Sequence, residues 1–299
     1  MIPIEDAAAG NDIVQTRAGT LAEQGGDLTV ARLERALLAR FPATDAEEWD
    51  RTGLTVGDPA VRVTGVAAAL DPTLSAVRAA AEVEANVLLT HHPLFLNPPV
   101  AVSSDPQRGG MPGAVAFEAA RLGVACLSFH TALDVSAQAA SVLPGMLRLD
   151  FERVLVPLAH DVRKGYGQLC AVRDEDGSAE TLADLAARCT AVFGRPPRVW
   201  GDFARLVRTA VTATGSAGNV VTACLTAGVD CLICGEVKYH AALDAVQQGL
   251  CIIELGHDVS ELPLATLLAA AAVDAGVAAS AVRVLDQGDN WRLPDSIRL

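Results

Sequence analysis

Apolar residues along this chain form short runs, and segments of helical periodicity lie between the runs. The strand-like runs are TGVAAAL at 64–70, NVLLT at 86–90 and VACLSF at 124–129. Helical patterns at 73–83 and 112–123 separate them, and another helix at 30–41 follows the capping residue Thr29. Strand, helix and strand in this order predict a parallel sheet with right-handed crossovers.

The same pattern recurs later in the chain. Strand-like and helical segments at 208–214, 217–228 and 230–236 align without a gap with those at 64–70, 73–83 and 86–92, since 215 − 71 = 144 and 235 − 91 = 144. We interpret this as two diverged copies of one unit, although any two strand-helix-strand units look alike at this level. The expected fold class is α/β, with duplicated, intertwined strand-helix units that form parallel-rich sheets with helices on the faces.

Domain organisation follows from the position of the two copies. Between them, 165–177 is strand-like, and 178–194 is an amphipathic helix with Ser178 as a candidate cap. Residues 1–27 show no sustained period and are expected to form a mobile tail. We expect a first α/β lobe from 28–135 together with 250–299, and a second α/β lobe from 136–249.

Composition narrows the class of protein. Apolar residues make up 51% of the 299 residues and aromatic residues only 4%, so the core must consist of Ala, Val and Leu. The net charge of −13 argues against general nucleic-acid binding. The chain has neither an apolar run of 18 residues nor a basic, signal-like start, which predicts a cytoplasmic protein without a membrane span. The pair Cys231 and Cys234 falls inside a predicted buried strand and does not suggest a metal knuckle.

Histidines gather where the predicted strands end. His91 and His92 follow one strand, and His130 and His257 follow two others, although the chain has only six histidines. The carboxyl edge of an open parallel sheet is where ligands bind. Taken alone, His91 and His92 could be two exposed loop residues. However, adjacent side chains on an extended chain point to opposite sides, so these two imidazoles can face two different metal ions.

Two carboxylates complete the candidate site. Glu261 follows His257 by four residues, which places both on one face if a helix begins there, and a capped helix start remains the alternative. Asp134 lies four residues after His130 and could instead cap a helix. Imidazoles mixed with carboxylates suit Zn, Fe, Mn or similar ions. The expected metal ligands are His91, His92, Asp134, His257 and Glu261. His130 is expected either to support these ligands from behind or to face the substrate.

The motifs and their order resemble the dinuclear-metal GTP cyclohydrolase I type 2 homologues, also called NGG-one-interacting-factor-like proteins. The resemblance covers about residues 28–275. It rests on EEWDRTGLTVGD at 47–58, ALDPT at 69–73, LLTHHPLF at 88–95, FHTALD at 129–134, GYG at 165–167, CGEVKYH at 234–240 and GHDVSE at 256–261. It implies a two-metal centre on the five ligands named above, and a ring-shaped homo-hexamer. Ala132 and the stretch 137–141 depart from the family pattern, which puts substrate contacts rather than metal ligands in doubt.

The favoured function is a hydrolase that holds two divalent metal ions per chain and acts on a nucleotide-like small molecule. Two ions about 3.5–4 Å apart can lower the pKa of a shared water towards 7, and the resulting hydroxide attacks carbon or phosphorus. His130 is the candidate catalytic residue and would either relay a proton or hold the leaving group. Arg163, Lys164 and Lys238 are candidates for contacts with a triphosphate. The alternative is a non-catalytic scaffold or regulatory protein whose metals stabilise its fold and assembly.

Overall fold

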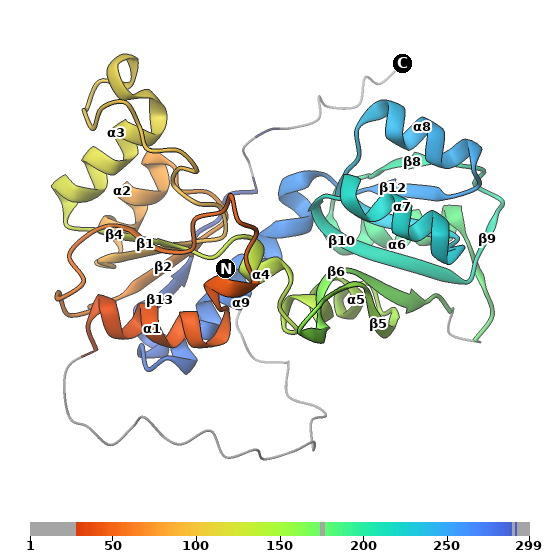
Figure 1. Ribbon diagram of the computed structural model, residues 1–299, viewed down its shortest axis with the longest axis horizontal. Helices are drawn as coiled ribbons and strands as arrows, with labels where there is room; N and C mark the ends of the chain where they lie inside the picture. The colour runs from red at the N-terminus through yellow and green to blue at the C-terminus, as the bar shows by residue number, and fades with distance from the viewer. Residues whose placement is uncertain (1–27, 174–176, 289–290, 292–299) are drawn as a thin grey trace.

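The computed structural model describes residues 28–173, 177–288 and 291, so the tail expected at 1–27 lies outside the described residues. Two lobes stand side by side, one with a five-stranded sheet and the other with a six-stranded sheet. Helix α9 (His257–Asp274) lies between the two lobes (Figure 1).

The five-stranded sheet has the order β1-β4-β3-β2-β13, and only β1 is antiparallel to its neighbour. Its strands are β1 (Gly53–Val56), β2 (Val66–Ala69), β3 (Val87–Thr90), β4 (Ala125–Ser128) and β13 (Val282–Val284). The helices that cover it besides α9 are α1 (Val30–Arg40), α2 (Leu74–Glu82) and α3 (Pro106–Leu122). Side chains alternate across this sheet, because Val87 and Leu89 pack with α1 and α9, whereas Leu88 packs with α2 and α3.

The six-stranded sheet has the order β5-β6-β10-β11-β12-β8, with a parallel centre at β10, β11 and β12. Its strands are β5 (Asp150–Leu158), β6 (Asp161–Ala171), β8 (Arg198–Trp200), β10 (Thr209–Ser216), β11 (Cys231–Glu236) and β12 (Cys251–Glu254). Helices α7 (Gly218–Ala227) and α8 (Tyr239–Gln247) cover one face, and α6 (Leu182–Phe193) covers the other. The shorter elements are α4 (Thr131–Asp134), α5 (Val142–Met146) and the small pair β7 (Glu180–Thr181) and β9 (Leu206–Val207).

The two sheets repeat one arrangement, which confirms the duplicated α/β class. The parallel order β4-β3-β2 in the first sheet corresponds to β12-β11-β10 in the second. An antiparallel strand lies beside the last parallel strand of each set, β1 beside β4 and β8 beside β12. Helices α2 and α7 begin 144 residues apart, since 218 − 74 = 144.

The structure differs from the sequence expectations in three local details. Strand β12 pairs with β11 in the six-stranded sheet, although we had assigned residues 250–299 to the first lobe, because the third strand of the second copy stays with its own copy. Helix α6 is capped by Thr181 rather than Ser178, since the Thr181 side chain accepts a hydrogen bond from Asp184 N. Helix α3 begins earlier than expected, but Gly110 breaks it at φ 69°.

Helix α9 is apolar because it is buried inside the chain. It contacts strands of both sheets, among them β2 and β10. Its low charge therefore follows from packing within the chain and does not indicate an exposed face for another subunit. Within the described residues, the helices are too short or too polar to cross a bilayer.

We expect Leu268→Ala to lower the free energy of unfolding by about 2–5 kcal/mol, because it leaves a cavity in the core under the first sheet. Leu268 is fully buried there. Thr266 is exposed on the same helix, so Thr266→Ala serves as the control. Urea unfolding measures both variants, and equal stability of the two would contradict this assignment of the core.

Candidate metal centre

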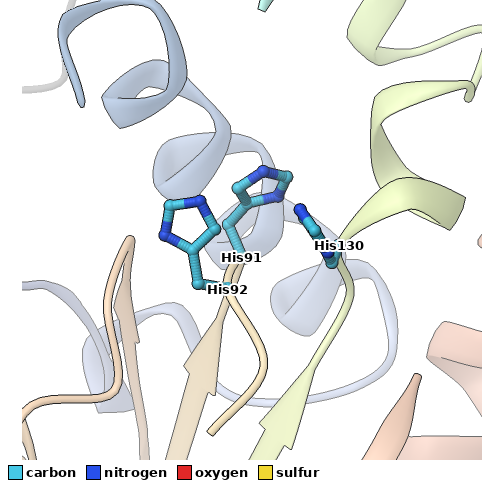
Figure 2. A group of neighbouring side chains, drawn as sticks. All are labelled: His91, His92 and His130. Carbon is cyan, nitrogen blue, oxygen red and sulfur yellow. The ribbon is translucent and has the colours of Figure 1, made fainter. Parts of the chain in front are cut away.

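The candidate site lies where the carboxyl ends of the two parallel sheets face each other. His91 and His92 directly follow β3, and His130 follows β4. Figure 2 shows these three rings gathered around one space at the ends of the two strands. The ring centroid of His130 lies 5.2 Å from that of His91 and 5.5 Å from that of His92.

Helix α9 supplies the other half of the site. Strand β12 ends at Glu254, and α9 begins at His257 after a connection of two residues. The expected helix start is therefore confirmed. His257 and Glu261 then lie one turn apart, and His257 Nε2 is 3.1 Å from Glu261 Oε2. Gly256, at φ 106°, occupies the N-cap position and lets the chain turn into the helix.

Glu261 joins two groups of side chains. Its Oε2 lies 3.0 Å from His92 Nε2, so His92, His257 and Glu261 form one group. Its Oε1 lies 3.6 Å from His91 Nε2, and that nitrogen is 3.7 Å from Asp134 Oδ1, so His91, Asp134 and Glu261 form a second group. All five expected ligands therefore lie in one cluster, with one carboxylate common to both groups.

The surroundings of His91 fit a cation. The side chain is fully buried, and among the described residues its Nε2 has no hydrogen-bond partner. Two ligands that each lie about 2.1 Å from a tetrahedral ion are about 3.4 Å apart. The separations of 3.6 and 3.7 Å from Glu261 and Asp134 are too long for hydrogen bonds and close to that value. Burying an unpaired imidazole nitrogen is costly, and a metal ion would satisfy it.

Each imidazole of these two groups is oriented through its other nitrogen. His91 Nδ1 lies 3.2 Å from the carbonyl oxygen of Phe129, and His92 Nδ1 lies 2.7 Å from Asp71 Oδ1. His257 Nδ1 lies 3.1 Å from Glu236 Oε1. Such partners hold the proton on Nδ1 and leave the lone pair of Nε2 for a metal.

The pKa values reflect this crowding of carboxylates and imidazoles. Burial lowers the pKa of His92, but hydrogen bonds to Asp71 and Glu261 outweigh it and raise the pKa to about 10. The hydrogen bond to Glu261 raises the pKa of His257 to about 9. Burial raises the pKa of Asp134. Burial acts in the same direction on Glu261, but the surrounding imidazoles outweigh it and hold the pKa of Glu261 well below its usual value. The cluster thus attracts positive charge, which protons or metal ions can supply.

His130 belongs to a separate hydrogen-bonded pair. Its Nδ1 lies 3.2 Å from Asp50 Oδ1. Thr131 fixes the other oxygen, because its backbone N–H and hydroxyl donate to Asp50 Oδ2 over 2.9 and 2.5 Å. Burial raises the pKa of Asp50, but these hydrogen bonds outweigh it and lower the pKa below its usual value. A ring nitrogen of His130 also lies within 4.8 Å of ring nitrogens of His91 and His92.

Two cavities open onto the cluster. One of about 500 Å³ is bordered by His130, Asp134, His257 and Glu261 together with residues of both lobes: Trp49, Tyr166, Ser216 and Asn219. The other, of about 570 Å³, is bordered by His92 and His257, and further by Asp71, Arg195, Arg198 and Trp291. The cluster is therefore reachable by a small molecule from two sides.

Sequence reasoning missed several residues of the site and proposed others that lie elsewhere. Asp71 directly follows the predicted strand at 64–70, and Glu236 ends the one at 230–236. Their place at the carboxyl ends of parallel strands was the available signal, and we did not use it. Arg163 and Lys164 are held by ion pairs with Asp161 and Asp45, and neither borders the two cavities. Lys238 occupies the N-cap position of α8 and borders neither of the two cavities.

One glycine makes room for the shared carboxylate. Gly215 at the end of β10 has φ +57°, and a Cβ there would lie 2.1 Å from Glu261 Oε1. Its N–H donates to Ser260 Oγ over 2.9 Å, and Ser260 in turn donates to the carbonyl oxygen of His257. The turn that follows β10 thus supports the first turn of α9.

Comparison with known proteins identifies relatives over most of the chain. The family described as Duf34/NIF3 (NGG1p interacting factor 3) matches residues 28–285. A protein of Streptomyces coelicolor named GTP cyclohydrolase 1 type 2 homolog is 32% identical over 239 residues, which are 79% of this chain and 82% of that protein. A protein of Clostridium acetobutylicum with the same name is 26% identical over 225 residues, which are 74% of this chain and 81% of that protein.

Solved structures share the fold. The crystal structure of a hypothetical protein from Staphylococcus aureus aligns with a TM-score of 0.79 at 23% identity, over 90% of this chain and all of that one. That of a Bacillus cereus protein related to NIF3 aligns with a TM-score of 0.75 at 19% identity, over 86% and 96%. These findings confirm the resemblance drawn from the sequence motifs, and the chain belongs to the Duf34/NIF3 family.

Proposed function

We propose that this chain is a dinuclear metal-dependent hydrolase, related in activity to a GTP cyclohydrolase, that acts on a nucleotide-like small molecule. The observation that carries the proposal is the position of Glu261, which belongs to two groups of potential ligands at once. A carboxylate can bridge two cations and reduce their mutual repulsion, which an imidazole cannot do. His91 with Asp134 would complete one site, and His92 with His257 would complete the other.

The residues beside the metal sites support hydrolysis. Two divalent ions, when bound, supply Lewis-acid chemistry and an activated water. Asp50 holds the Nδ1 proton of His130, so His130 Nε2 is available to accept a proton or to donate one to a leaving group. The cavity of about 500 Å³ beside His130 has room for a small-molecule substrate, and Trp49 and Tyr166 offer aromatic surface for a flat base.

A non-catalytic metal scaffold remains the second candidate. Its specific support is the origin of the ligands: His91, His92 and Asp134 come from the first copy, whereas His257 and Glu261 follow the last parallel strand of the second copy. Bound ions would therefore tie the two lobes together and stabilise the fold by mass action. Metal analysis and then a turnover screen against nucleotides and phosphodiesters separate the candidates. A fully metallated protein that converts nothing, and that unfolds when a chelator is added, favours the scaffold.

We expect Glu261→Gln to give folded protein with about one metal ion per chain or fewer, because the amide keeps the shape but removes the bridging charge. Elemental analysis after dialysis against Zn²⁺ or Mn²⁺ measures the stoichiometry. Glu82 is exposed on α2, so Glu82→Gln is the charge-matched control. Two ions retained by Glu261→Gln would show that Glu261 serves only as a residue of the helix start.

We expect His130→Gln to lower kcat by about 10²–10⁴-fold on a substrate found by the screen, with both metal ions retained, because it removes the group that transfers the proton. Asp50→Asn should lower kcat less and should shift the pH profile, since it changes which nitrogen of His130 carries the proton. His160 lies outside both cavities, on the segment between β5 and β6, and His160→Gln is the control. Unchanged kcat in His130→Gln would remove His130 from the reaction.

We also propose a homo-oligomer, with a hexamer as the state that the family resemblance implies, and a cytoplasmic location. Exposed apolar side chains support the association, among them Val100, Val102 and Met111, with exposed fractions of 96%, 58% and 51%. Sedimentation velocity at micromolar concentration should show a species larger than one chain of 31.0 kDa. A clean monomer at that concentration would contradict the proposal.

A further inference from the structure

Gln287 lies three residues beyond β13 and makes three hydrogen bonds to the end of β2. Its Oε1 accepts from the backbone N–H groups of Leu70 and Asp71, each over 2.8 Å. Its Nε2 donates to the carbonyl oxygen of Asp71 over 2.9 Å. Leu285 N already donates to Ala68 O over 2.8 Å, so the side-chain amide of Gln287 continues the parallel ladder where the backbone of β13 no longer does.

Leu70 and Asp71, which form hydrogen bonds with Gln287, also form hydrogen bonds with His92. The backbone N–H of His92 donates to the carbonyl oxygen of Leu70 over 2.9 Å. The imidazole Nδ1 of His92 lies 2.7 Å from Asp71 Oδ1. Leu70 and Asp71 therefore fix His92 at two points, and Gln287 fixes Leu70 and Asp71.

We propose that Gln287 is a positioning residue for His92 and thereby sets the affinity of one of the two metal sites, an inference that rests on the proposed dinuclear centre. Without the amide of Gln287, two N–H groups and one carbonyl at the strand end lose their partner. The Asp71 carboxylate is then free to move, and the direction of His92 Nε2 towards Glu261 is no longer fixed. Loss of such an outer partner typically weakens metal binding by about 10–100-fold.

The effect should be confined to one site. His91 is oriented by the carbonyl oxygen of Phe129, which follows β4 and has no contact with Gln287 among the hydrogen bonds of the described chain. Asp134 is held separately, by the hydroxyl of Thr214 over 3.0 Å. The group of His91, Asp134 and Glu261 therefore keeps its geometry when Gln287 is changed. Gln287 also lies beyond residues 28–285, the part of the chain that matches the family.

The test compares Gln287→Leu, Gln287→Glu and the wild type in titrations of metal-free protein with Zn²⁺ or Mn²⁺, well below the unfolding temperature. Gln287→Leu removes all three hydrogen bonds, and one of the two sites should weaken about 10–100-fold while the other is unchanged. Gln287→Glu keeps the two accepted hydrogen bonds and loses the donated one. The metal affinity of its weakened site should therefore lie between those of Gln287→Leu and the wild type. Gln248 donates its side-chain amide to the carbonyl oxygen of Asp244 on α8, so Gln248→Leu is the matched control without effect on metal binding.

Double variants assign the weakened site. His257→Ala removes a candidate ligand from the group that contains His92. In this background, Gln287→Leu should cause little further loss of metal affinity. Added to Asp134→Asn, it should weaken the remaining site by its full factor. Two results would overturn the inference about Gln287 but leave the dinuclear proposal intact. One is unchanged metal affinity in folded Gln287→Leu and Gln287→Glu, and the other is equal weakening of both sites. A wild type that binds fewer than two ions would instead overturn the dinuclear proposal, and the inference with it.

Discussion

The structure depends on one constraint: a buried carboxylate, Glu261, must be surrounded by groups that offset the cost of its burial. Its side chain is only 4% exposed, and three imidazoles surround it. Because those imidazoles follow parallel strands of two different sheets, both sheets must direct their carboxyl ends at the first turn of α9. The position of α9 between the lobes is thus fixed at its start by charge and further along by apolar packing, as Leu264 and Leu268 show.

The duplication explains why a single centre lies between two similar lobes. At the positions 144 residues after Asp71 and His91, the second copy has Gly215 and Gly235. A Cβ at Gly215 would collide with Glu261, and one at Gly235 would lie 2.4 Å from the carbonyl oxygen of Gly215. At these two positions the first copy therefore places side chains of the candidate site, whereas the second copy leaves space for Glu261 and for the backbone.

Much of this could be predicted from sequence, and the exceptions have physical reasons. The strands at 66–69 and 231–236 and the histidines that follow strands were predictable, because buried parallel strands are continuous apolar runs and ligands bind at their carboxyl ends. The roles of Asp50 and Gln287 were not, because each depends on a contact between segments distant in sequence: Asp50 lies 80 residues from His130, and Gln287 lies 216 residues from Asp71. The position of α9 between the lobes was not predictable either, because burial inside the chain and burial against another subunit leave the same apolar pattern in a sequence.

The hydrogen-bond partners of the imidazoles separate the two candidate roles of the histidines. His91 and His92 both have an acceptor at Nδ1 and a carboxylate oxygen near Nε2, which is the arrangement of a metal ligand with its outer partner. His130 has Asp50 at Nδ1, but its ring also borders the cavity shared with Trp49 and Tyr166. An imidazole between a fixed carboxylate and an open cavity can exchange protons with a bound molecule, whereas a fully buried one such as His91 cannot. His92 and His257 also border cavities, so exposure alone does not separate them from His130. What separates them is the Glu261 carboxylate near each Nε2, which supports the proposal that His91, His92 and His257 hold cations while His130 faces the substrate.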